Sequence, residues 1–188
     1  MSYDSAVNMQ RPGVLAATQG VWNKFYFNDA VAYANFATGS ANLGWFKHVY
    51  NPRPFTATHG WVLNGASVPG NIDIGIYSVS RGTTGGITRI GSSGAIAGGT
   101  INVVQFLPLS VVVPEGDVVL AISYSSASAQ IKTRNQPDWN NYFRQLVGMG
   151  RSNAAQHPLP SNVSYSGLIN DELLTGGLPL FGVCNRLY

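Results

Sequence analysis

The sequence predicts an all-β fold, an antiparallel β-sandwich with at most one short helix. Apolar residues recur at every second position in several segments, as they do in strands that bury one face. Turn-forming residues interrupt these segments roughly every 8 to 12 residues, the spacing typical of a sandwich or barrel. Charged residues make up only 10% of the chain, against roughly 25% in average globular proteins, which argues against long solvated helices.

The chain is long enough for one domain with one core, since it has 188 residues. Residues 1–20 show no hydrophobic period and are predicted to be an N-terminal arm. Residues 21–188 are predicted to form a single β-sandwich domain. Its first clear strands are expected at residues 44–50 and 58–64, on either side of the turn sequence N-P-R-P.

The two clearest strands lie in the middle of the chain. Residues 71–77 place Ile72, Ile74 and Ile76 on one face, so we expect a half-buried antiparallel strand. Residues 117–124 alternate in the same way after a P-E-G turn. Between them, residues 100–113 contain Pro108, which cannot donate to a sheet, so we expect an edge strand or a bulge there.

Three further segments complete the predicted order of elements. Residues 82–99 are rich in Gly, Ser and Thr around Ile87 and Ile90, which predicts a hairpin. Residues 137–148 are the one helix candidate, with Asp138 as a capping residue and Gly148 as a stop. The apolar residues 178–183 predict a terminal strand that closes the sheet.

Charge and cysteine content exclude several classes of protein. The net charge is +3 and the basic residues are scattered, so no nucleic-acid surface is expected. A single cysteine, Cys184, excludes an intramolecular disulfide framework and is expected to be a buried apolar residue. No apolar run approaches the roughly 18 residues of a membrane helix, and the N-terminus does not resemble a signal peptide. We expect a soluble protein without membrane insertion.

The residues for catalysis or metal binding are sparse. Eight Asp and Glu residues lie mostly at turns or on strand surfaces, and no spacing builds an acid–base pair. A glycan hydrolase remains an alternative, and it would depend on Asp73 or Asp117. His48, His59 and His157 lack metal-site spacing, although His48 and His59 could meet across neighbouring strands. The sequence therefore predicts no enzyme, no metal site and no cofactor.

A group of aromatic and amide side chains is the best candidate for contact with a glycan or a protein partner. Rings stack on sugar faces or partner surfaces, and amides pair with hydroxyl groups. The favoured interpretation is that these rings cap the sandwich or lie in a subunit interface. The candidate residues are Trp139, Asn140, Asn141, Tyr142 and Arg144.

Five segments in order carry a resemblance to a known family. They are F-K-H-V-Y-N-P-R-P-F at 46–55, T-H-G-W-V-L at 58–63, N-I-D-I-G-I-Y at 71–77, P-E-G-D-V-V-L-A-I at 114–122 and L-P-L-F-G-V at 178–183. In this order they resemble a β-sandwich family of tailed-bacteriophage virion proteins, across roughly residues 20 to 185. The resemblance implies a jelly-roll type of sandwich, commonly trimeric, mounted on a phage particle as a fibre tip, head fibre or decoration knob.

The function expected from this resemblance is that of a non-enzymatic virion protein, a homotrimeric knob assembled in the host cytoplasm. The chain has no heptads for a stalk, which favours a capsid decoration or head fibre bound directly to the particle. The alternative is a tail receptor-binding protein that recognises host glycan. The arm would dock on a capsid or tail protein, and its candidate contacts are Tyr3, Met9, Arg11 and Trp22.

Overall fold

The computed structural model describes residues 14–16, 33–37, 41–79, 85–134, 149–152, 156–164 and 178–185. Within these residues every regular element is a β-strand and none is a helix, which confirms the all-β prediction. The helix expected at residues 137–148 lies outside the described residues.

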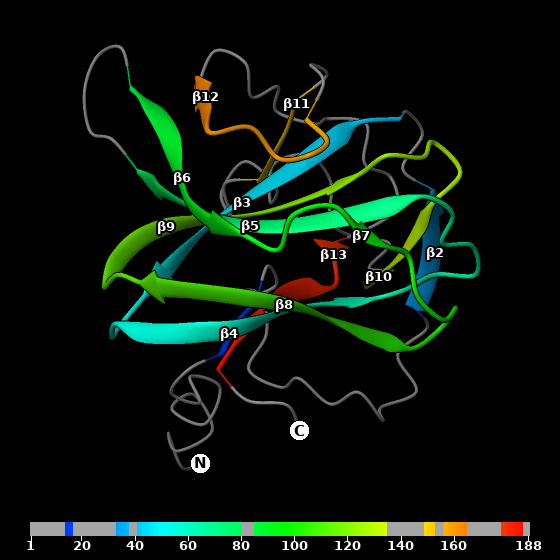
Figure 1. Cartoon of the computed structure of the whole chain (residues 1–188), viewed down its shortest axis with the longest axis horizontal. Helices are drawn as coiled ribbons and strands as arrows, with labels where there is room; N and C mark the ends of the chain where they lie inside the picture. Colours follow the sequence, from blue (N-terminus) through cyan, green and yellow to red (C-terminus); the bar gives the residue numbers. More distant parts are fainter. Residues whose placement is uncertain are drawn as a thin grey trace, which may run out of the picture.

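The strands form three antiparallel sheets (Figure 1). The first sheet has the order β1 (Val14–Ala16), β14 (Phe181–Cys184), β4 (Phe55–Leu63) and β8 (Val104–Val113). The second has the order β11 (Met149–Ser152), β3 (Leu43–Asn51), β9 (Gly116–Tyr124), β5 (Asn71–Val79), β6 (Gly86–Ser92) and β12 (Asn162–Ser164), and β7 (Ile96–Ala97) also pairs with β5. A small third sheet has the order β13 (Leu178–Pro179), β10 (Gln130–Arg134) and β2 (Tyr33–Ala37).

The strand order is that of a jelly roll. Its eight principal strands, in chain order, are β1, β3, β4, β5, β6, β8, β9 and β14. One sheet then contains the first, eighth, third and sixth of them, and the other contains the second, seventh, fourth and fifth. Because successive strands repeatedly cross between the two sheets, each sheet is completed by strands from both halves of the chain. The predicted jelly-roll sandwich is confirmed.

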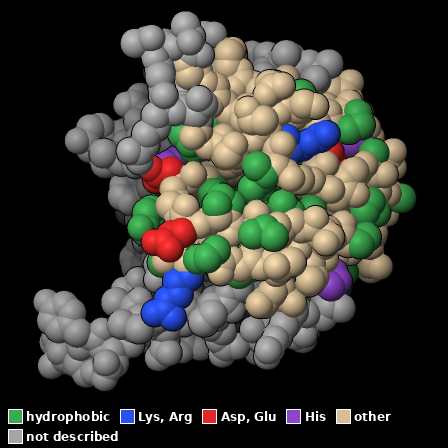
Figure 2. All heavy atoms as spheres, turned by 60° about the vertical axis from the view of Figure 1, so that its left-hand side comes forward, with side chains coloured by type: hydrophobic (Ala, Val, Ile, Leu, Met, Phe, Trp, Pro, Cys, Tyr) green, Lys and Arg blue, Asp and Glu red, His purple; other side chains and the backbone are tan. Residues whose placement is uncertain are grey.

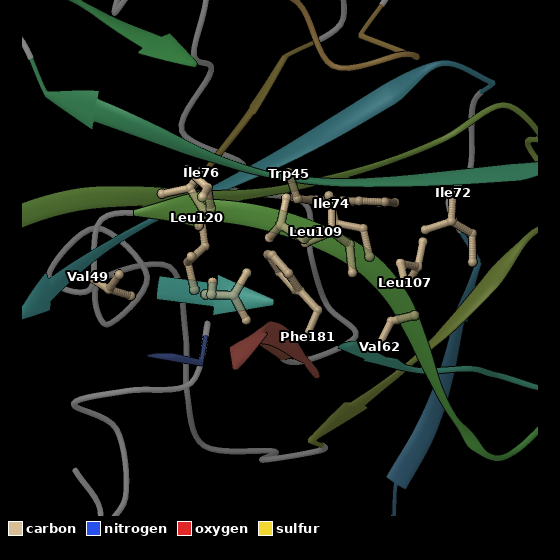
Figure 3. Packing of buried hydrophobic residues seen from close by; sticks show 14 of the residues in the cluster. Trp45, Val49, Val62, Ile72, Ile74, Ile76, Leu107, Leu109, Leu120 and Phe181 are labelled. Atoms are coloured by element: carbon tan, nitrogen blue, oxygen red, sulfur yellow. The ribbon is translucent and has the colours of Figure 1, made fainter. Parts of the chain in front are cut away.

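The core lies between these two sheets (Figure 3). β5 contributes Ile72, Ile74 and Ile76, and the facing strands contribute residues such as Leu107 and Phe181. All five side chains are fully buried. The period-two pattern in the sequence therefore identified the core face of β5 correctly.

The other face of β5 differs from the prediction. Asp73 and Tyr77, which alternate with the isoleucines, are also fully buried, so the expectation of a half-buried strand is wrong. The reason is a second apolar cluster on that face, in which Tyr77 packs with Phe46 and with Leu159 from a distant segment. The rings of Phe46 and Tyr77 meet edge to face, with centroids 5.6 Å apart.

The strand with the internal proline is an edge strand, as predicted. Among the described strands β8 pairs with β4 alone, and the register shifts between Ala57 and His59. Pro108 lies opposite His59, directly at this irregularity. Both expectations, an edge and a bulge, are met because a residue without an amide hydrogen can be tolerated there.

Three other segments need comment. The hairpin expected within residues 82–99 is wrong, because Ile87 and Ile90 lie in one strand, β6, which pairs with β5, as β7 also does. Within the segment expected to be an arm, Val14–Ala16 form β1 and pair with β14. The terminal strand is present as β13 and β14, and Cys184 in β14 is buried as expected.

Two buried tyrosines offer a matched test of this packing. The hydroxyl of Tyr124 is buried and has no hydrogen-bond partner among the described residues, whereas that of Tyr77 donates to the carbonyl of Pro160 at 2.8 Å. We expect Tyr124→Phe to leave stability unchanged or raise it by about 1 kcal/mol, since it removes an unsatisfied polar group. Tyr77→Phe should lower stability by about 1 to 2 kcal/mol, since it orphans a carbonyl. Urea denaturation measures both, and equal effects would contradict this assignment.

Candidate functional site

A strap crosses the outer face of the second sheet. We call residues 156–164 the strap, and they include the cis peptide bond between His157 and Pro158. The strap starts beside β3, where the amide of Gln156 donates to the carbonyl of Asn42 at 2.8 Å. It ends as β12, which pairs with β6. It therefore runs across the strands rather than along them, and it covers the edge of β6 (Figure 1).

The middle of the strap is held by a buried carboxylate. Asp73 on β5 is fully buried, and its Oδ2 accepts a hydrogen bond from the amide of Leu159 at 2.9 Å. Its Oδ1 accepts a weaker bond from Ser93 Oγ at 3.3 Å. The guanidinium of Arg89 on β6 donates to the carbonyl of Leu159. The carboxylate of Asp73 thus holds the amide of Leu159, and the guanidinium of Arg89 holds its carbonyl. These two charge-assisted hydrogen bonds fix the position of Leu159 over the sheet.

The same region contains a serine, a histidine and an aspartate. Ser123 Oγ on β9 lies 3.1 Å from His157 Nδ1, while Nε2 of the ring is buried and finds no hydrogen-bond partner in the described part of the chain. Burial lowers the pKa of His157, although Asp73 and a hydrogen bond with the backbone of Ser123 act in the opposite direction. Ser123 is fully buried, and both oxygens of Asp73 are already used by Leu159 and Ser93. This group anchors the strap, and it lacks both the exposed nucleophile and the histidine–aspartate bond of a catalytic triad.

The carboxylates considered for a hydrolase do not come together. Asp73 lies opposite Ser123 in the sheet, six residues along β9 from Asp117, a separation of about 20 Å. Carboxylates that act as an acid–base pair on a glycosidic bond lie roughly 5 to 10 Å apart. The Oδ1 atom of Asp117 instead lies 3.2 Å from Nε2 of His48. These two residues therefore do not form a glycosidase pair.

The histidines do not form a metal site in the part of the chain that is described. His48 lies on β3 in the second sheet and His59 on β4 in the first, so the two do not meet as the sequence allowed. His59 Nδ1 is 2.9 Å from Thr58 Oγ1. Among the described residues no three His, Cys, Asp or Glu side chains are grouped as metal ligands.

A buried lysine is the most unusual charged group of the molecule. Lys47 alternates along β3 with the core residues Trp45 and Val49, so its side chain points between the two sheets, and it is only 1% exposed. Burial lowers the pKa of Lys47 from its ordinary value to about 7. A lysine in this position weakens the core near neutral pH, where the amine is partly charged.

The first sheet carries no formal charge. Its strands β1, β14, β4 and β8 contain no Lys, Arg, Asp or Glu at all. The second sheet, in contrast, contains Lys47, Asp73, Arg89, Asp117 and Arg151. Figure 2 shows a face of the molecule on which charged side chains are few and hydrophobic side chains lie between them.

Exposed apolar side chains gather on the edge strand of the uncharged sheet. Phe106, Pro108 and Val112 alternate with core residues on β8 and point outward, and we call them the β8 surface. Val112 is 66% exposed and Phe106 is 38% exposed. The turn before β8 adds Ile101 and Val103, so four of the six large exposed hydrophobic side chains among the described residues lie between residues 101 and 112. Such a concentration on one strand is typical of an interaction surface.

The site residues predicted from sequence lie outside the described residues. This applies to the glycan or partner candidates Trp139, Asn140, Asn141, Tyr142 and Arg144. It applies equally to the arm candidates Tyr3, Met9, Arg11 and Trp22.

Sequence reasoning missed the strap and the β8 surface. For the strap, the available signal was Asp73, a carboxylate between Ile72 and Ile74 in an otherwise apolar strand, which called for a covering partner. For the β8 surface, the available signal was the absence of charged residues from all four segments that form the first sheet.

The fold thus places the chain among the jelly-roll β-sandwiches, a class that hosts many functions. Comparisons of the chain with protein-family models, with curated proteins and with solved structures found no match. In the described part of the chain, no helix has the length and apolar character required to span a bilayer.

Proposed function

We propose that this chain is a non-enzymatic structural protein of a tailed-bacteriophage particle, where it forms a homotrimeric jelly-roll knob as a capsid decoration or head fibre. The observation that carries the proposal is the uncharged first sheet with its exposed β8 surface. An apolar, neutral surface is suited to permanent contact with another protein, because no charge has to be desolvated. The jelly-roll order of strands agrees with the fold that the resemblance implies.

The polar groups of the molecule support the same proposal. Asp73, Ser123 and His157 hold the strap, and Asp117 pairs with His48. Each of these groups has a structural role, which is what a particle component requires. The knob assembles in the host cytoplasm. In the finished particle, its N-terminal arm binds a capsid or tail protein.

Self-association through the β8 surface can be tested with one charge. We expect the wild-type protein to be a trimer by native mass spectrometry and Val112→Glu to weaken the trimer by at least about tenfold, because a carboxylate would be buried against apolar groups. Ile90→Glu is the matched control, since Ile90 is a comparably apolar, 37% exposed side chain on the other sheet. A monomeric wild-type protein, or equal effects of the two variants, would refute this part of the proposal.

The position on the particle requires a separate experiment. Purified phage particles are labelled with a gold-conjugated antibody against the protein, and the labels on head and tail are counted. Label over the head supports a decoration or head fibre. Label confined to the tail tip would replace this function by receptor binding, and unlabelled intact particles would refute a surface knob.

A further inference from the structure

The strap covers apolar side chains on the outer face of the second sheet. It seals an apolar cluster on the outer face of the second sheet, to which it contributes Leu159 and Val163. Beneath it lie Phe46, Tyr77 and Val119, all of which are buried. If the strap opened, this cluster and the edge of β6 would become accessible. The position of the strap therefore decides whether the second sheet presents an apolar surface.

His157 is placed so that its protonation opposes this closed position. In the neutral ring one nitrogen is a donor and the other an acceptor. Ser123 Oγ lies 3.1 Å from Nδ1, and its hydroxyl group can either donate to this nitrogen or accept from it. Protonation makes both nitrogens donors. Nε2 is buried and has no hydrogen-bond partner among the described residues, so the closed strap would enclose a charged donor to which none of them offers an acceptor.

The charged and titratable groups around His157 do not remove this conflict. From β5, Asp73 favours the protonated ring electrostatically, but both of its oxygens already accept bonds from Leu159 and Ser93. From β6, the guanidinium of Arg89 adds positive charge beside the same strap residue. Tyr77 on β5 donates to Pro160 and stays neutral, because burial raises its pKa.

We propose that the strap is a pH-sensitive cover, which is closed over the second sheet at neutral pH and released by protonation of His157 in mildly acidic solution. This goes beyond the proposed function, because it assigns a conditional surface to the opposite sheet from the β8 surface. Burial lowers the pKa of His157 in the closed form below the ordinary value of about 6.5 expected in the open form. The closed form thus binds the proton less readily, so closure is complete above about pH 6.5 and weakens as the pH falls.

Amide hydrogen exchange of the intact protein, read by mass spectrometry, tests the cover. Rates at about pH 7.5 and about pH 5.5, corrected for the intrinsic effect of pH, bracket the ordinary pKa of imidazole. Protection of residues 156–164 should fall by as much as tenfold for each pH unit below about 6.5. Protection of the core strands β5 and β9 should follow only the change in global stability, and protection of the strap should fall further than theirs. Unchanged protection of the strap would overturn the proposal.

Two variants separate His157 from other titrating groups. His157→Gln keeps a hydrogen-bonding side chain next to Ser123 and cannot be protonated, so protection of the strap should no longer depend on pH. His59→Gln, on the other sheet, should retain the dependence of the wild-type protein. A pH dependence that persists in His157→Gln would overturn the proposal.

A measurement on the wild-type protein covers the case in which His157→Gln does not fold. In an NMR titration, the imidazole of His157 and the amide of Leu159, which is bonded to Asp73, should share one midpoint below about pH 6.5. A midpoint at or above that value, or an amide that does not follow the imidazole, would contradict the proposal.

Discussion

The free energy of unfolding is expected to rise as the pH increases from about 7 to about 10, because of Lys47. Burial lowers the pKa of this lysine from 10.5 to about 7 in the folded protein. Between these values the unfolded chain binds a proton that the folded chain does not bind, and stability then increases with pH. The slope is at most about 1.4 kcal/mol per pH unit, and the whole interval contributes on the order of 4 kcal/mol.

Two tyrosines determine the pH at which the free energy of unfolding stops increasing. Burial raises the pKa values of Tyr77 and Tyr124. Above about pH 10 the unfolded chain loses tyrosine protons that the folded chain keeps, so stability falls again. Maximum stability is therefore expected near pH 10, well above the usual range between about pH 5 and 8.

The variant Lys47→Met isolates the contribution of the lysine. Methionine has a similar shape and no charge to bury, so stability at pH 7 should increase. The slope between about pH 7 and about pH 10 should disappear. Lys132→Met is the control, since Lys132 is only partly buried on β10, and it should retain the slope.

Urea denaturation at several pH values and one protein concentration measures these effects, because an oligomer's stability depends on concentration. A wild-type stability that stays constant or falls between pH 7 and 10 would show that Lys47 is not buried in the core. An identical slope in Lys47→Met would assign the pH dependence to another group.

The elements with a strict period of two could be predicted from the sequence. Ile72, Ile74 and Ile76 face the core as expected, and Pro108 marked the edge strand. These features are local, since alternation and a missing amide are visible within one segment. The jelly-roll order, in contrast, came from the resemblance and not from any single strand.

The parts that were missed depend on contacts between distant segments. Asp73 is buried because Leu159, 86 residues further along the chain, lies over it. Lys47 follows the same alternation as its core neighbours, but a lysine in a strand is normally taken as exposed. Pro108 marked β8 as an edge, but the lack of charge across its sheet is visible only once β1, β14 and β4 are placed beside it. None of these arrangements can be assigned from one stretch of sequence, because each needs the position of a distant segment.

Replacement of one residue at the end of the chain is expected to remove much of the stability of the fold. Phe181 on β14 is fully buried in the core between the sheets (Figure 3). β14 lies between β1 and β4, so the last strand of the chain completes the first sheet from within. Phe181→Ala should cost about 3 to 5 kcal/mol, because it leaves a cavity in the core. Domains of this size are stable by only about 5 to 15 kcal/mol in total.

Two matched variants show whether the loss arises from the core. Phe181→Leu keeps most of the volume and should cost about 1 kcal/mol. Phe106→Ala removes the same side chain from the β8 surface, where 38% of it is exposed, and should change the stability of the monomer by less than about 1 kcal/mol. Urea denaturation followed by tryptophan fluorescence compares the three. If Phe181→Ala and Phe106→Ala had equal effects, β14 would not be the strand that closes the jelly roll.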